Sequence, residues 1–129
     1  MKPLFYFFSF FSILFFIACK EDSVATPKKR KYAGSVELYN SCGTTNAAAK
    51  MTSFLRKNGF DVVSTKNDLL QNYKETIIAI RNPQWEGAEA LAKLLQTENI
   101  LQLKNELSLI DVTVYIGKDF NKIIEQELP

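Results

Sequence analysis

The order of apolar and polar residues along the chain predicts one small α/β domain that follows a very apolar N-terminal segment. Alternating apolar and polar residues indicate a strand with one buried face, and apolar residues three or four positions apart indicate a helix with one buried stripe. Strands are predicted at residues 36–40, 60–65, 76–80 and 111–116, with a short edge strand at 100–103. Helices are predicted at residues 44–59 and 84–97, with a last helical turn or two around Phe120.

These elements predict an α/β, or α+β, two-layer sandwich with the order β-α-β-β-α-β. Each of the two main helices has a single apolar stripe, so both are expected to cover the same face of one mainly antiparallel sheet. In the commonest arrangement of this order, the first and last strands are antiparallel neighbours. The second face of the sheet is then expected to be open.

Three residues are expected on this open face because successive side chains of a strand point to opposite sides. Tyr39, Thr113 and Tyr115 are out of phase with the apolar residues of their strands. Tyrosine rings stack on sugars and their hydroxyls form hydrogen bonds, so these residues are candidates for ligand binding. Trp85 is another candidate for sugar stacking, but it begins an apolar helix stripe, which favours the core.

The turn after the first strand is a further candidate. Backbone amides at the start of a helix attract phosphate or carboxylate groups, so Asn40 and Gly43 are included as ligand-binding candidates. The alternative is that Asn40, with Thr44 or Thr45, satisfies those amides itself. Cys42 lies in the same turn, where it is interpreted as a small apolar residue, a reactive thiol or the site of an intermolecular disulfide.

The first 19 residues are typical of an export signal. A single basic residue is followed by an apolar run that is too short to span a membrane, and the charged residues Lys20, Glu21 and Asp22 follow Cys19. The end of the run, from Phe16 to Cys19, resembles the lipobox of bacterial lipoproteins, which implies that Cys19 is the lipidation site. An uncleaved apolar anchor is the alternative. Residues 20–34 are predicted to form a flexible tether, and residues 35–129 the folded domain.

Charge and composition narrow the function classes. From Tyr32 onward the chain has ten basic and twelve acidic residues, so no nucleic-acid partner is expected. Histidine is absent from the whole sequence, which removes the commonest general base and metal ligand. The Asp111 and Asp119 carboxylates flank one strand too far apart for a shared site, and capping or turn roles are expected for them. We therefore expect no catalytic residues, no metal and no cofactor.

Four runs of the domain form a recognisable set: residues 36–43, 55–62, 88–95 and, most specifically, 111–120. Through these runs the domain resembles the C-terminal domain of the LytR-CpsA-Psr family of cell-envelope proteins over roughly residues 35–120. The first turn has Ser41 where members of that family usually have glycine. Catalysis in the long family members belongs to a separate domain, so the resemblance implies an envelope location and no catalysis.

The sequence thus predicts a non-enzymatic lipoprotein of the cell envelope, anchored in a membrane on its periplasmic or extracellular side. The expected function is binding of a cell-wall glycopolymer or peptidoglycan on the open sheet face. The alternative is an adaptor that joins an envelope protein assembly through its edge strand.

Overall fold

A computed structural model of the 129-residue chain describes residues 30–70 and 72–126. The predicted signal segment, the lipidation site Cys19 and most of the predicted tether lie outside the described residues. The elements, in chain order, are β1 (Val36–Asn40), α1 (Ala47–Lys57), β2 (Val62–Asn67), β3 (Ile77–Ile80), α2 (Ala88–Leu95), β4 (Ile100–Gln102), β5 (Val112–Ile116) and α3 (Phe120–Glu125).

The five strands form one mixed sheet with the order β2-β1-β5-β3-β4. β1 is parallel to both β2 and β5, β3 is parallel to β4, and only β3 and β5 are antiparallel. The prediction of a mainly antiparallel sheet is therefore wrong. The first and last strands are neighbours, but they are parallel.

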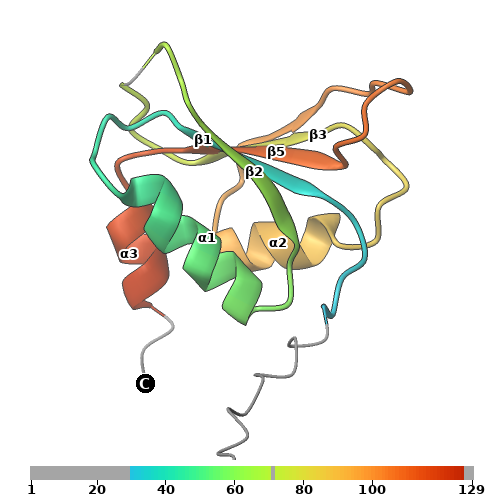
Figure 1. Ribbon diagram of the computed structural model, residues 1–129, viewed down its shortest axis with the longest axis horizontal. Helices are drawn as coiled ribbons and strands as arrows, with labels where there is room; N and C mark the ends of the chain where they lie inside the picture. Colours follow the sequence, from blue (N-terminus) through green and yellow to red (C-terminus); the bar gives the residue numbers. More distant parts are fainter. Residues whose placement is uncertain (1–29, 71, 127–129) are drawn as a thin grey trace, which may run out of the picture.

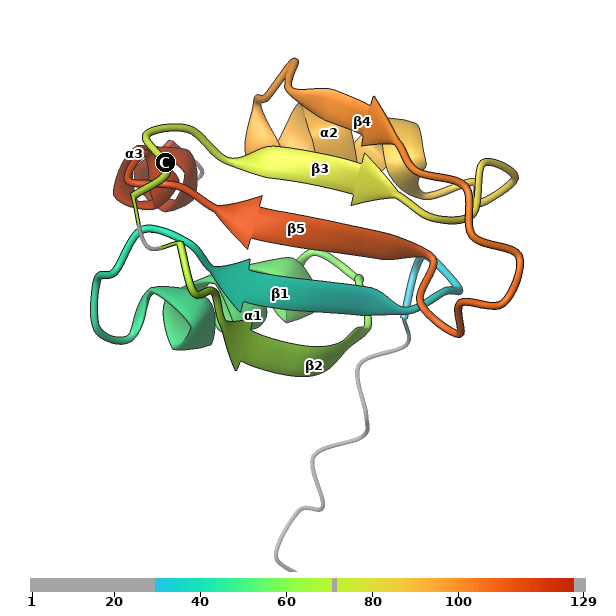
Figure 2. The ribbon, with the colours of Figure 1, turned by 90° about the horizontal axis from the view of Figure 1, so that it is seen from above.

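The connections explain these strand directions. A helix joins β1 to β2 and another joins β3 to β4, and a helical crossover leaves the two strands that it connects parallel. The direction of successive strands changes only across the β2–β3 loop and across the β4–β5 loop. After two reversals β5 runs in the direction of β1, between β1 and β3, as Figure 2 shows.

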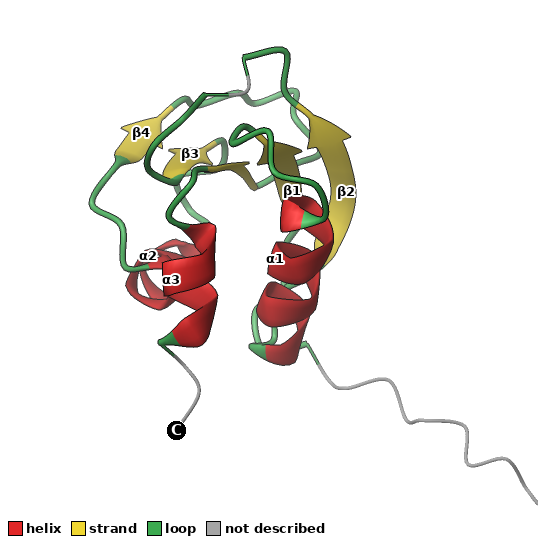
Figure 3. Cartoon of the chain, turned by 90° about the vertical axis from the view of Figure 1, so that its left-hand side faces the viewer, coloured by secondary structure: helices red, strands yellow, loops and turns green. Residues whose placement is uncertain are grey.

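The helices α1, α2 and α3 lie on one face of the sheet, and within the described part of the chain no helix covers the other face (Figures 1 and 3). The core between the two layers is formed by the strand residues of one parity and by the apolar stripes of the helices. Leu38, Val114 and Ile78 come from the strands, and Leu55 and Leu91 come from the helices; all five are fully buried. The helix-covered side of the sheet is thus the side that the alternation of apolar residues indicates.

The second helix begins later than its sequence pattern predicts. The Asn82 side chain accepts a hydrogen bond from the Gln84 amide at 3.1 Å, and its carbonyl accepts one from the Trp85 amide at 3.1 Å. These bonds form a turn before the helix, which starts at Ala88. Trp85 therefore precedes the helix, and it is buried in the core.

Residues 30–34 pack on the domain, although the sequence pattern assigns them to the tether. The amides of Lys31 and Tyr32 donate to the Gly59 carbonyl at 3.0 and 3.1 Å, and the Tyr32 ring stacks on Phe60 with a centroid distance of 4.6 Å. Trp85 Nε1 donates to the Ala33 carbonyl at 2.5 Å. Residues 30–34 are therefore packed against the domain, because long-range contacts order a segment that has no apolar pattern of its own.

Asp111 attaches the start of β1 to the β3–α2 loop. Its two carboxylate oxygens accept hydrogen bonds from the Ser35 amide at 2.7 Å and from Asn82 Nδ2 at 2.8 Å. Burial by itself raises the pKa of the Asp111 carboxyl, but the hydrogen bonds from Asn82 and Ser35 outweigh burial and hold the pKa below its ordinary value. Asp111 therefore has a structural turn role.

Candidate functional site

The open face of the sheet is the candidate functional site, and Figure 2 looks onto it. Register places Tyr39 of β1 directly beside Tyr115 of β5, and Glu37 beside Thr113 in the neighbouring row. Lys66 of β2 lies beside Tyr39 on the outer side. The β2–β3 and β4–β5 loops rise at opposite ends of the sheet on this open side (Figure 1). The face therefore gathers aromatic, hydroxyl and charged side chains from four strands and their ends.

The two predicted tyrosines form a stacked pair. Their ring centroids are 5.3 Å apart and their planes differ by 23°, and both residues are half-buried. Parallel pairing of β1 and β5 brings the rings together, because it sets Tyr39 in register with Tyr115. A third ring, from Tyr73 in the β2–β3 loop, lies with its centroid 6.2 Å from that of Tyr115. These residues, Tyr39, Tyr73 and Tyr115, are called the tyrosine cluster below.

Thr113 lies on the open face, as its position in the strand predicts. It is buried, however, whereas the sequence pattern predicts an exposed residue. Its exposed fraction is 1%. Arg81, the residue after β3, donates from Nε to Thr113 Oγ1 at 3.4 Å and from its terminal Nη2 to the Tyr115 hydroxyl at 3.5 Å. The long arginine side chain thus lies across the short threonine and covers it. Thr113 supports the surface, and Arg81 forms part of it.

A second cation borders the tyrosine cluster. Lys66 Nζ lies 2.6 Å from Glu37 Oε1 and 5.5 Å from the centroid of the Tyr39 ring. The hydrogen bond and the charge of Glu37 raise the pKa of the Lys66 ammonium above its ordinary value. The Glu37 side chain is only 12% exposed, so this pair is a fixed part of the face.

Three residues of this face, Lys66, Tyr73 and Arg81, were not identified from the sequence. Arg81 continues the parity of Ala79 beyond the end of β3, which was a usable signal. The pairing of β1 with β2 is irregular next to Val36, where the register shifts. This shift breaks the alternation of buried and open-face residues along β2, so the alternation that starts at Val62 does not place Lys66 on the open face. Tyr73 comes from a loop, where no periodic pattern indicates which way a side chain points.

The turn that contains Asn40 and Gly43 is held by its own hydrogen bonds, but no side chain among the described residues caps the first amides of α1, which begins after Asn46. Asn40 Nδ2 donates to the Thr44 carbonyl at 2.9 Å, and Asn40 Oδ1 accepts from the Cys42 amide at 3.4 Å. Ser41 Oγ donates to the Asp68 carboxylate at 2.7 Å, so a negative charge lies beside the turn. Gly43 has the positive φ of 74° that glycine tolerates best. The geometry favours a structural turn over an anion site.

Cys42 is buried, with an exposed fraction of 5%, and its Sγ lies 3.2 Å from Asn40 Oδ1. Burial agrees with the interpretation of Cys42 as a small core residue. It disfavours both a reactive thiol and a disulfide to another chain, because each needs an accessible sulfur atom.

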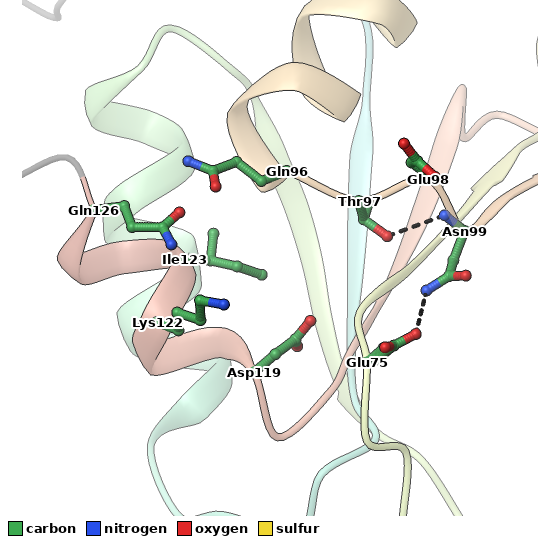
Figure 4. A pocket seen from close by; sticks show the side chains of 9 residues that line it. All are labelled: Glu75, Gln96, Thr97, Glu98, Asn99, Asp119, Lys122, Ile123 and Gln126. Atoms are coloured by element: carbon green, nitrogen blue, oxygen red, sulfur yellow. Dashed lines mark hydrogen bonds between the residues drawn. The ribbon is translucent and has the colours of Figure 1, made fainter.

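A depression of about 430 Å³ lies between the end of α2 and α3, and Figure 4 shows its lining. Thr97 Oγ1 donates to the Thr76 carbonyl at 2.8 Å, and Asn99 Nδ2 donates to Glu75 at 2.9 Å. Asp119 accepts from the Thr76 amide at 3.0 Å and from its hydroxyl at 2.7 Å. These groups bind one another, so they connect α3 and the α2–β4 loop to β3. Their role is structural.

The edge of the sheet at β4 is apolar and accessible. Ile100, Leu101 and Leu103 have exposed fractions of 39%, 49% and 44%, and among the strands that the structure describes β4 pairs with β3 alone. An exposed edge strand offers unpaired backbone groups to another strand.

Within residues 30–70 and 72–126, no helix has the length and apolar character needed to cross a membrane.

Comparison with known proteins identifies one family. The family described as LytR cell envelope-related transcriptional attenuator (LytR_C) matches residues 34–120. Among solved structures, the solution structure of the C-terminal domain of RV0431 is similar to this chain, with 25% sequence identity and a TM-score of 0.45. That similarity covers 71% of this chain and 78% of the other. Among curated protein sequences there is no significant match.

Proposed function

Because the chain belongs to the LytR cell envelope-related transcriptional attenuator family, we propose that it binds a cell-wall glycopolymer or peptidoglycan without catalysing a reaction. Membership of the family gives the chain a cell-envelope-related role. The proposal adds a ligand class to that role and assigns its recognition to the open face of the sheet.

The stacked pair of Tyr39 and Tyr115 carries this proposal. The two half-buried rings are held in register by neighbouring strands, so little conformational freedom is lost when a ligand covers them. Tyrosine rings offer an apolar surface for the C–H face of a sugar, and their hydroxyls offer hydrogen bonds. Lys66 and Arg81 add charged donors beside the rings. Aromatic and polar groups gathered in this way suit a polar polymer better than an apolar one.

The test is a double substitution, Tyr39→Ala with Tyr115→Ala, in the full chain dissolved in detergent. Binding to isolated cell-wall material is expected to weaken by about 1–3 kcal/mol, because aromatic side chains that a ligand covers contribute binding energy of this size. Co-sedimentation with the insoluble wall material measures the dissociation constant. Circular dichroism establishes that the variant remains folded.

The matched control is Tyr39→Phe with Tyr115→Phe, which keeps both rings and removes both hydroxyls. It separates stacking, which the control retains, from hydrogen bonding, which it loses. A folded alanine variant that binds wall material as strongly as the unsubstituted chain would exclude the open face as the binding surface.

We also propose that the domain is attached to a membrane through a lipid on Cys19. The four residues from Phe16 to Cys19 carry this proposal, because they resemble a lipobox. The described chain enters the domain beside Asp61, where Arg30 forms an ion pair of 2.6 Å, on the side of the helices (Figure 1). Attachment from that side leaves the open face accessible to a polymer.

The anchor is tested by Cys19→Ser. Loss of the acyl chains is expected to move the protein from the membrane fraction to the soluble fraction, because each buried methylene contributes about 0.8 kcal/mol to membrane binding. Fractionation of cells, with immunoblotting of the chain, measures the distribution. A variant that remains in the membrane fraction with its N-terminal segment uncleaved indicates an apolar anchor instead of a lipid.

The apolar edge at β4 favours a second candidate function, an adaptor that pairs with an envelope protein. The exposed leucines and the single pairing partner of β4 are the features that strand addition uses. We prefer glycan recognition because the tyrosine cluster and its two cations form a polar, aromatic surface, which strand addition does not require.

A further inference from the structure

Arg81 differs from the other charged residues of the open face. It is half-buried, and among the described residues it forms no ion pair with a carboxylate. Lys66, the other cation of this face, is neutralised by Glu37. Cations that are partly withdrawn from water are normally paired. The arginine charge is therefore available to a ligand.

Asp111 lies across the strand pair from Arg81, because β3 and β5 pair Ile80 with Val112, but its carboxylate forms no ion pair with the guanidinium. The carboxylate accepts hydrogen bonds from Ser35 and Asn82, and the Asp111 carbonyl accepts from the Arg81 amide at 2.8 Å. The carboxylate is thus engaged by neutral groups at the end of the strand.

Neutral hydroxyls hold the guanidinium in position. Nε donates to Thr113 and Nη2 to Tyr115, at 3.4 and 3.5 Å, which makes both hydrogen bonds longer and weaker than usual. These contacts engage two of the five N–H donors of an arginine and direct the guanidinium toward the Tyr115 hydroxyl. A guanidinium oriented in this way can donate two parallel hydrogen bonds to a phosphate or a carboxylate.

There is room for an anionic group next to Arg81. The residue lines a depression of about 600 Å³ that is bounded by residues 82–84 and by the β4–β5 loop. Lys104 in the same lining is paired with Glu106 at 2.6 Å, and the Asp111 carboxylate, which also lines the depression, is bonded to Ser35 and Asn82. Arg81 is therefore the cation of this lining that has no carboxylate within ion-pair distance among the described residues. A polymer that stacks on the tyrosine cluster can continue past Arg81 into this depression.

We propose that Arg81 selects an anionic envelope polymer by binding a phosphate or carboxylate group of the repeating unit that stacks on Tyr39 and Tyr115. This inference rests on the function proposed above. It makes the ligand a charged glycopolymer instead of a neutral glycan. Thr113 and the Tyr115 hydroxyl act as positioning groups for the guanidinium.

The experiment compares wall material before and after its anionic groups lose their charge, with phosphodiesters and carboxylates converted to uncharged methyl esters so that the polymer stays on the wall. The probes are these two preparations, and the protein is the full chain in detergent. The unsubstituted chain is expected to bind the neutralised material at least about tenfold more weakly, because hydrogen bonds to charged groups contribute about 1.5–3 kcal/mol. Arg81→Gln is expected to bind untreated material about as weakly as the unsubstituted chain binds the neutralised material.

Two variants serve as controls. Arg81→Lys keeps the charge but loses the paired donors, so it is expected to restore only part of the affinity for untreated material. Lys93→Gln removes a positive charge from α2, on the helix side of the sheet, where Lys93 is paired with Glu89. It is expected to bind like the unsubstituted chain, which excludes a general effect of net charge.

The possible failures are distinguishable. If Arg81→Gln binds untreated material as strongly as the unsubstituted chain while the double tyrosine variant still loses affinity, the anion site is wrong and the proposed function stands. If the double tyrosine variant binds normally as well, the proposed function fails. An Arg81→Gln variant that weakens binding equally to both preparations assigns Arg81 to positioning Tyr115 and contradicts the anion site. If that variant does not fold, equal binding of both preparations by the unsubstituted chain contradicts the proposal.

Discussion

Replacing Trp85 by alanine is expected to lower the free energy of unfolding by about 3–5 kcal/mol, the usual cost of removing a buried aromatic side chain. The indole is 7% exposed and contacts the Phe60 ring edge-on with a centroid distance of 6.2 Å. It also fits between two glycines, because a Cβ atom on Gly34 or on Gly87 would overlap it. Gly34 and Gly87 have no side chains that could occupy the space of the indole, so the alanine variant is expected to contain a cavity.

Urea titration followed by circular dichroism measures this loss, since Trp85 is the single tryptophan of the chain and its fluorescence disappears with it. The matched variant is Trp85→Phe, which retains most of the apolar contact and loses the hydrogen bond to the Ala33 carbonyl. It is expected to lose less stability than the alanine variant.

The same substitution has a local consequence at residues 30–34. Arg30 and Lys31 are already exposed, but Trp85 holds the Ala33 carbonyl. Removal of the indole is expected to detach the backbone of residues 30–34, so that trypsin cleaves after Arg30 and Lys31 faster than global unfolding allows. Cleavage at these residues at the rate of the unsubstituted chain would contradict the attachment of this segment through Trp85. A loss of stability below about 1 kcal/mol would contradict the core assignment of the indole.

Replacing Phe120 by alanine is expected to cost about 3–5 kcal/mol as well. Phe120 begins α3, is 1% exposed and is the largest of the fully buried side chains. Lys50 of α1 lies with its Nζ 5.9 Å from the centroid of the Phe120 ring, so the residue joins the last helix to the first. A short terminal helix with such an anchor belongs to the core of the domain.

Thermal unfolding and urea titration of the full chain in detergent measure the effect. Phe120→Leu nearly conserves apolar volume and is expected to cost less than about 1.5 kcal/mol, whereas Glu125→Ala on the exposed side of α3 is expected to change stability little. If Phe120→Ala were as stable as Glu125→Ala, α3 would contribute nothing to the core.

Much of the candidate site was predictable from parity. Tyr39 and Tyr115 were placed on the open face because they alternate with Leu38 and Val114, and this local periodicity is a property of any strand. The exposure of Thr113 was not predictable in the same way. Whether a short side chain is exposed depends on its neighbours across the sheet, and Arg81, 32 positions earlier in the chain, covers it.

The sequence by itself determined the elements, the buried side of the strands and the family, because each depends on residues that are close together in the chain. Apolar spacing within about ten residues is enough to indicate that Leu55 and Leu91 lie on the buried faces of their helices. Only the tertiary structure decided the strand directions. These depend on how the β2–β3 and β4–β5 loops place β5 between β1 and β3. That placement made β1 and β5 parallel and stacked Tyr39 on Tyr115. It also brought an arginine without a carboxylate partner, among the described residues, beside that pair. Contacts between residues distant in the sequence depend on the packing of the whole domain, which a local pattern does not contain.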